Sequence, residues 1–265
     1  MEYVTLNDGH KMPILGFGVY LIPASQTVKA VTTALNDGYR LIDTAEYYRN
    51  EKEVGQAVRE SGIPRDEIFV TTKMPPQASY EEAAKRIDES LAALDIDYID
   101  LMLIHWPGRN NVDTYRALED AQKAGKVRSI GLSSFYGADY QQILDECDVI
   151  PAVDQNETHV FRQQKEFQKV LKSHGTELEA WSPFAEGKNN IFKNATLSKI
   201  AQKHSKTVAQ VILRFLIQRG IIVIPKSVHE ERIAENIDVF DFELDSEDMA
   251  TIDAMNEEKS AFGWY

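Results

Sequence analysis

The sequence predicts a closed (β/α)8 TIM barrel, in which parallel strands are surrounded by helices. Short apolar segments typical of buried strands alternate with amphipathic stretches of helical period. Eight such strands can be recognised, and 265 residues is an ordinary length for one barrel. Because neither a Pro- and Ser-rich linker nor a low-complexity tract divides the chain, we expect a single domain over residues 1–265.

The chain is expected to open with a β-hairpin. Tyr3–Leu6 and Lys11–Ile14 flank the segment Asn7–His10, whose Asp-Gly pair is a strong signal for a tight turn. The barrel strands are expected at Leu15–Tyr20, Arg40–Asp43, Ile68–Lys73, Tyr98–His105, Arg128–Ser133, Ala152–Gln155, Glu177–Trp181 and Ile221–Ile224. The helices between them include Gln26–Asp37, Glu51–Glu60, Tyr80–Leu94, Thr114–Ala124, Gln163–Ser173 and Thr207–Gln218, and an extra C-terminal helix is expected at Asp245–Asn256.

A doubly wound open sheet is the alternative architecture. It would place a Gly-rich turn directly after its first strand. The early Gly16-Phe17-Gly18 lacks a third glycine and lies within a predicted strand, so we favour the barrel. The longest interruption, Ser182–Asn194, follows the seventh strand and would lie on the catalytic face of a barrel.

Composition narrows the class of function. The formal net charge of −13 argues against nucleic acids and anionic membranes as partners, because both attract positive surfaces. The one cysteine, Cys147, cannot form an internal disulfide, and the N-terminus has no apolar segment of signal-peptide type. We therefore expect a cytoplasmic protein, and a monomer.

Ionisable residues end three consecutive predicted strands. Side chains alternate between the two faces of a strand, and on one face the apolar series ends in Asp43, Lys73 or His105. The C-terminal ends of barrel strands carry the catalytic residues of barrel enzymes. Tyr48 follows Asp43 in a tyrosine-rich turn. The four side chains are thus predicted to meet at the mouth of the barrel.

Each of the four residues taken alone has a simpler interpretation. Asp43 could cap the next helix, Lys73 could extend to solvent, His105 could be a core histidine, and Tyr48 could be a packing residue. Together they form a titratable cluster, which favours a functional site. The six histidines show neither H-x-H nor H-E-x-x-H spacing, so a metal-dependent hydrolase is disfavoured and no metal is expected.

Three segments resemble signatures of the aldo-keto reductases. They are GYRLIDTA at 38–45 with Tyr48, Asn50-Glu51 and Val54-Gly55 after it, LMLIHWP at 101–107, and IPKS at 224–227 followed by Arg232 and Asn236. The resemblance extends from about Tyr3 to about Asn256. Within the family the sequence is most similar to the compact bacterial members related to 2,5-diketo-D-gluconate reductase, and Trp181 supports that placement.

The resemblance implies reduction of aldehydes and ketones with NADPH. It implies that Tyr48 is the general acid, that Lys73 and Asp43 tune it, and that His105 orients the carbonyl oxygen. The residue types suit these roles. A phenol has an ordinary pKa of about 10, a nearby ammonium lowers that pKa, and a carboxylate keeps a buried lysine charged.

The resemblance also implies a set of cofactor contacts. The expected residues are Ser133, Ser134, Gln155, Trp181, Ser182, Phe184, Gly187, Lys226, Ser227, Arg232 and Asn236. Gln155 and the two serines match positions that hold the carboxamide, Trp181 matches the aromatic that stacks on the nicotinamide, and 182–187 matches the loop over the pyrophosphate. Lys226, Ser227 and Arg232 match the positions that bind the 2′-phosphate, and Asn236 the position at the adenine. Ser134 and Asp154 depart from the family's usual asparagines.

The substrate pocket is expected at Tyr20, Tyr47, His105, Trp106 and Trp264. An aromatic and polar wall suits small aldehydes, α-keto aldehydes and dicarbonyls. A second hypothesis is a redox-sensing regulator that binds NADPH with little turnover. The complete group of Asp43, Tyr48, Lys73 and His105 favours the enzyme, because a sensor does not need it.

Overall fold

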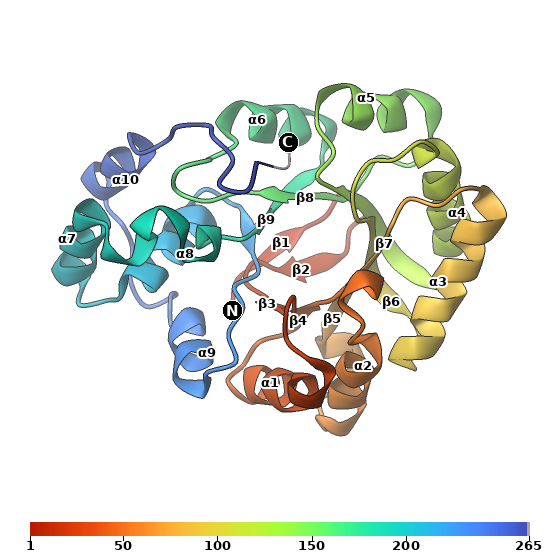
Figure 1. Cartoon of the computed structure of the whole chain (residues 1–265), viewed down its shortest axis with the longest axis horizontal. Coiled ribbons are helices and arrows are strands. Elements are labelled where there is room, and N and C mark those ends of the chain that lie inside the picture. Colours follow the sequence, from red (N-terminus) through yellow and green to blue (C-terminus); the bar gives the residue numbers. More distant parts are fainter. Residues whose placement is uncertain (264–265) are drawn as a thin grey trace.

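The computed structural model describes residues 1–263, and eight parallel strands form a barrel in chain order (Figure 1). They are β3 (Phe17–Gly18), β4 (Leu41–Asp43), β5 (Phe69–Met74), β6 (Ile99–Ile104), β7 (Val127–Ser133), β8 (Val153–Glu157), β9 (Glu177–Trp181) and β10 (Ile222–Val223). The first and last strands meet, because Leu15 bridges Val223 and the Gly18 amide donates to the Pro225 carbonyl at 3.0 Å. The predicted (β/α)8 barrel is confirmed.

The predicted hairpin closes the N-terminal end of the barrel. Strands β1 (Tyr3–Thr5) and β2 (Lys11–Pro13) pair antiparallel, and Figure 1 shows them across the centre of the ring of strands. Leu6 and Met12 pack inside the barrel against residues such as Leu41. One end of the barrel is therefore covered, and the opposite end carries the carboxyl ends of the strands.

Ten helices are present in the described part of the chain, and most of them surround the barrel (Figure 1). They are α1 (Ala24–Asn36), α2 (Glu51–Glu60), α3 (Tyr80–Leu94), α4 (Asn111–Lys123), α5 (Gly137–Glu146), α6 (Lys165–His174), α7 (Ala195–His204), α8 (Val208–Gln218), α9 (Glu230–Ile237) and α10 (Ser246–Asp253). Helix α10 is the predicted C-terminal extra helix, which begins after the capping residue Asp245. Three shorter 3-10 segments lie at Glu46–Tyr48, Arg65–Glu67 and Ala185–Lys193.

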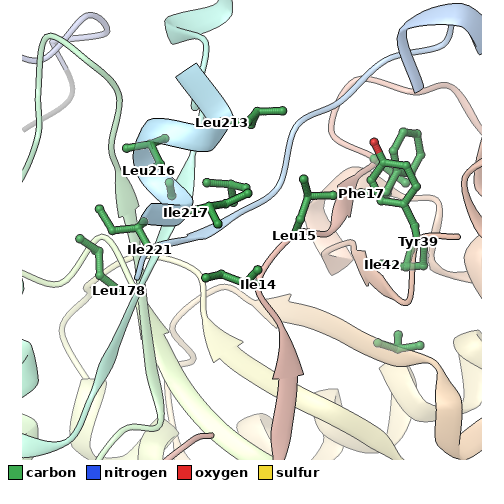
Figure 2. Packing of buried hydrophobic residues seen from close by; sticks show 14 of the residues in the cluster. Ile14, Leu15, Phe17, Tyr39, Ile42, Leu178, Leu213, Leu216, Ile217 and Ile221 are labelled. Carbon is green, nitrogen blue, oxygen red and sulfur yellow. The ribbon is translucent and has the colours of Figure 1, made fainter. Parts of the chain in front are cut away.

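Strand alternation divides the apolar residues into two layers. Leu101 and Leu103 of β6 belong to the cluster inside the barrel, whereas Met102 and Ile104 of the same strand pack in the cluster between strands and helices. Figure 2 shows part of the outer cluster, where side chains of α8 such as Leu216 approach the strands. The faces assigned from the sequence to β6 are therefore the observed ones.

The first barrel strand is shorter than predicted. Residues 15–20 were expected to be a strand, but only Phe17–Gly18 is one. Gly16 has a packing role, since a Cβ built there would lie 2.4 Å from Cγ of Leu41. The chain turns away at Leu21, whose φ of 58° is left-handed.

No helix within residues 1–263 combines the length and the apolar character that crossing a bilayer requires.

Candidate active site

A buried ion pair lies at the carboxyl ends of β4 and β5. Lys73 Nζ is 2.6 Å from Asp43 Oδ1, and both side chains are almost fully buried. The same ammonium donates to the Thr44 carbonyl at 3.0 Å and to Tyr48 Oη at 3.4 Å. Burial opposes the charged form of Lys73, but Asp43 and Tyr48 outweigh it and raise the lysine pKa above its ordinary value. A permanent cation therefore lies beside the phenol.

Tyr48 reaches this cation through the short 3-10 segment Glu46–Tyr48 that follows β4. Its ring lies between Tyr20 at 5.0 Å and His105 at 5.5 Å between ring centroids. Burial raises the pKa of the phenol to about 12, while Lys73 acts in the opposite direction. The ammonium does lower the pKa of Tyr48 as expected, but burial outweighs it, so the net shift is upward. Tyr48 is protonated at neutral pH and can donate a proton.

His105 follows β6 and is held by its backbone, whose amide donates to the Met74 carbonyl at 2.8 Å. Burial, and then the charge of Lys73, lower the pKa of the imidazole to about 2, so it is neutral. Its Nδ1 has no hydrogen-bond partner within residues 1–263, and the ring packs on Trp106 with centroids 4.7 Å apart. Because Nδ1 is buried, a ligand in the cavity can form a hydrogen bond with this neutral ring only through its other nitrogen.

Asp43, Tyr48 and His105 line a cavity of about 580 Å³, and the fully buried Lys73 lies behind them. Tyr20, Tyr47 and Trp106 of the predicted substrate pocket line it, and Trp264 lies outside the described residues. Sequence reasoning missed three lining residues, namely Gly18, Leu21 and Ile224, and it included Pro183 and Glu186 only as part of the loop 182–187. Ile224 follows β10 on the inward face, so alternation could have found it. No signal in the sequence predicts the turn at Leu21.

The opposite wall carries the residues expected at a nicotinamide. Ser133, Ser134, Gln155 and Trp181 all line the cavity. Ser134 has a left-handed φ of 61°, and its amide donates to the Gln155 carbonyl at 2.9 Å. Gln155 Nε2 donates to Asp43 Oδ2 at 2.9 Å, which links this wall to the ion pair.

One of the two departures from the family pattern, Asp154, lies away from the cavity because of strand register. Gln155 points into the barrel, so its neighbour Asp154 points to the other face of β8. Asp154 is fully buried, does not line the cavity, and burial raises its pKa well above the ordinary value. The replacement at position 154 therefore does not change the cavity wall. Glu179, which sequence reasoning missed, does point inward and is bound to Gln155.

The loop after β9 covers one side of the cavity in a conformation that favours glycine. Ser182, Ala185 and Glu186 all have φ near 50°. Non-glycine residues hold such values only where the surroundings impose them, and such residues gather at functional sites. Ser182, Phe184 and Glu186 line the cavity, whereas Gly187 does not.

The residues predicted for the 2′-phosphate and the adenine lie in the connection between β10 and α9 and in α9 itself. Lys226 lines the cavity. Ser227 is buried, and its hydroxyl accepts from the His229 amide at 3.1 Å. Arg232 is exposed on α9, and Asn236 is buried in the same helix. The structure therefore places only Lys226 at the cavity, with the other three beyond its rim.

The C-terminal segment is bound to the catalytic end of β8 through Glu157. This buried carboxylate accepts from His159 Nε2 at 3.0 Å, Arg162 Nη1 at 2.7 Å, Ser260 Oγ at 2.7 Å and the Ala261 amide at 2.7 Å. Burial opposes its charge, but these bonds lower its pKa to about 2. The segment is therefore held by a permanent charge.

The next residue in the chain contacts Trp181 in the wall of the cavity. Phe262 packs on Trp181 with ring centroids 5.2 Å apart, and Lys188 Nζ lies 3.9 Å from the centroid of the phenylalanine ring. The C-terminal segment thus helps to position Trp181.

Among residues 1–263, no three His, Cys, Asp or Glu side chains group so that they could hold a metal ion.

A sequence profile of the Aldo/keto reductase family matches residues 15–257. The chain belongs to the aldo/keto reductase family. Glyoxal reductase of Bacillus subtilis (strain 168) is 44% identical over 97% of this chain and 94% of its own length. The 9,11-endoperoxide prostaglandin H2 reductase of Trypanosoma cruzi (strain CL Brener) is 44% identical over 98% and 93%.

Solved structures of the family agree with the fold. An aldo/keto reductase from Brucella melitensis superposes with a TM-score of 0.91 at 44% sequence identity, over 96% of this chain and 99% of that one. The protein is thus an oxidoreductase of a family that acts on small carbonyl compounds and typically uses a nicotinamide cofactor.

Proposed function

We propose that this aldo/keto reductase reduces aldehydes and ketones to alcohols with NADPH, and that Tyr48 is the general acid. The observation that carries the proposal is the position of Tyr48 Oη, which lies 3.4 Å from Lys73 Nζ beside the neutral His105 at one cavity. A protonated phenol, a fixed cation and an uncharged hydrogen-bond donor together suit the protonation of a carbonyl oxygen.

The residues around the cavity divide the work of the reaction. When bound, NADPH would supply the hydride for the carbonyl carbon. His105 holds the carbonyl oxygen, and Tyr48 gives that oxygen a proton, which completes the alcohol. Lys73 then stabilises the phenolate until solvent returns a proton, and Asp43 keeps Lys73 charged. Trp181 offers an aromatic face to the nicotinamide, and Ser133 offers a hydroxyl to its carboxamide.

A preference for NADPH over NADH rests on two cations in a chain of net charge −13. Lys226 lies at the cavity and Arg232 on the helix that follows, and a phosphate monoester suits such a pair. Ser227 and Asn236 complete the adenosine end in this proposal.

The substrate class rests on the aromatic mouth formed by Tyr20, Tyr47 and Trp106. We propose small aldehydes, α-keto aldehydes and dicarbonyls, a class consistent with a relative named glyoxal reductase. We also propose that the chain acts in the cytoplasm as a monomer with one domain over residues 1–265. The acidic surface and the lone Cys147 support that assignment.

The decisive variant is Tyr48→Phe, which removes the proton donor and keeps the ring. We expect turnover of methylglyoxal with NADPH to fall by about three orders of magnitude or more, with NADPH affinity nearly unchanged. Tyr80→Phe, at the start of α3 and outside the cavity lining, is the matched control and should keep normal turnover. Near-normal turnover of Tyr48→Phe would contradict the proposed role.

A panel of carbonyl compounds with NADPH and NADH in parallel tests the rest of the proposal. We expect turnover with several small carbonyls and a lower KM for NADPH than for NADH. Tight NADPH binding without turnover across the panel would favour the redox-sensing regulator instead.

A further inference from the structure

A second carboxyl group lies inside the barrel behind the proposed catalytic residues. Glu179 is in the middle of β9, two residues before Trp181, and its side chain is fully buried. In the parallel ladder it pairs with Gln155 of β8 on one side and with Ile222 of β10 on the other. Glutamate is almost never fully buried without a partner, so its surroundings require an explanation.

Within residues 1–263, the one hydrogen bond to this carboxyl comes from the amide of Gln155. Gln155 Nε2 donates at 2.9 Å to Glu179 Oε2 and at 2.9 Å to Asp43 Oδ2. Glu179 Oε1 has no hydrogen-bond partner within residues 1–263. One amide therefore bridges two carboxyls, and the chain of contacts continues from Asp43 to Lys73 and Tyr48.

The charges in this group do not balance if both carboxyls ionise. Two ionisable side chains face Glu179, namely Asp43 from β4 and Lys73 from β5. The residues paired with Glu179 in β8 and β10 are uncharged. Asp43 is in direct contact with Lys73 at 2.6 Å, whereas Glu179 has no cation of its own. Keeping two carboxylates ionised in a buried site with one cation costs free energy, because one of the two charges has no compensating partner.

We propose that Glu179 is a positioning residue that remains protonated at neutral pH, so that Asp43 is the single negative charge beside Lys73, and that its ionisation at alkaline pH slows carbonyl reduction. The inference rests on the proposed role of Tyr48. Burial, and then the charge of Asp43, raise the pKa of Glu179 to about 8, which agrees with the geometry.

The sign of the effect follows from the chain of contacts. An ionised Glu179 adds negative charge near Asp43 and Lys73, and negative charge disfavours a phenolate at Tyr48. The pKa of Tyr48 rises, so the phenol becomes a weaker acid and proton donation slows. Reduction should therefore decline as pH rises through about 8 in the native protein.

Glu179→Gln tests this, because glutamine has the shape of the protonated acid and cannot ionise. We expect near-native kcat at pH 7, and loss of the decline in kcat near pH 8, so that the variant exceeds the native protein by about threefold or more at pH 9. The control is Glu177→Gln at the start of the same strand, which should keep the native pH profile. Superimposable profiles of Glu179→Gln and the native protein would overturn the proposal.

Infrared spectroscopy of the native protein provides a measurement that does not depend on a variant folding. With isotope-labelled glutamate, we expect a protonated-carboxyl band at pH 7 that disappears as pH rises through about 8. The band should be missing in Glu179→Gln, and its absence from the native protein at pH 7 would also overturn the proposal.

The two proposals fail in different measurements. Turnover by Tyr48→Phe would remove the proposed general acid, whereas the infrared band reports the proton on Glu179 whatever the reaction is.

Discussion

The two walls of the cavity are built in different ways. The wall from β4 to β6 is held by a buried ion pair and its hydrogen bonds, because Lys73 bonds to Asp43, Thr44 and Tyr48. The wall from β7 to β10 continues into loops with left-handed residues, and its cationic residues Lys226 and Arg232 are exposed. The first wall is preorganised, as the proposed proton transfer requires, and the second wall is open, as the proposed cofactor binding requires.

The difference agrees with the function proposed for each wall. A proton donor needs fixed charges in a dry site, because electrostatic effects are strongest where water is excluded. A dinucleotide needs a surface that it can enter, and the groups proposed to bind it lie on loops and near the start of a helix. The two walls meet at Gln155, whose amide contacts Asp43 while the residue lines the cavity.

The largest expected effect comes from breaking the preorganised wall with Lys73→Met. This leaves Asp43 buried without its cation, which should lower the free energy of unfolding by about 3–5 kcal/mol. Urea unfolding would measure that loss. Turnover should also disappear, because Tyr48 loses the cation that stabilises its phenolate. Lys85→Met on α3 removes an exposed lysine and should change neither quantity. Native stability in Lys73→Met would mean that the two walls do not differ in this way.

An intermediate effect is expected from Arg232→Ala in the open wall. The KM for NADPH should rise about tenfold, because a charge-assisted bond to a phosphate is lost. The KM for NADH and both kcat values should remain native, since the rest of the site is unchanged. Steady-state kinetics with both cofactors would measure this, with Lys85→Ala as control. An equal rise for NADPH and NADH would show that Arg232 does not recognise the 2′-phosphate.

The smallest effect is expected at Cys147, which follows α5 and lines neither wall of the cavity. Burial, and then nearby Glu119, raise the pKa of this thiol to about 12, so about one molecule in ten thousand carries a thiolate at pH 8. Alkylation by iodoacetamide at pH 8 should be slow, and Cys147→Ser should keep native turnover. Rapid alkylation with loss of activity would place a functional group outside both walls.

Much of the preorganised wall could be predicted from local pattern. Asp43 and Lys73 end apolar series on one face of their strands and His105 directly follows one, and strand geometry alone brings such residues to one end of a barrel. The pKa of Tyr48 could not be predicted in this way. Its direction depends on how deeply the ring is buried relative to the nearby cation, and that balance exists only in the folded chain.

The sequence by itself determined the alternation of strands and helices, the closed barrel and the residue types at the mouth, because these depend on short-range periodicity. The tertiary structure decided which side chains contact one another. Glu179 in the middle of β9 has no distinctive local signal, yet register places it against Gln155 and behind Asp43. Asp154, one residue from Gln155, faces the helices instead. Long-range register and burial set these contacts and charges, and neither can be read from a single segment.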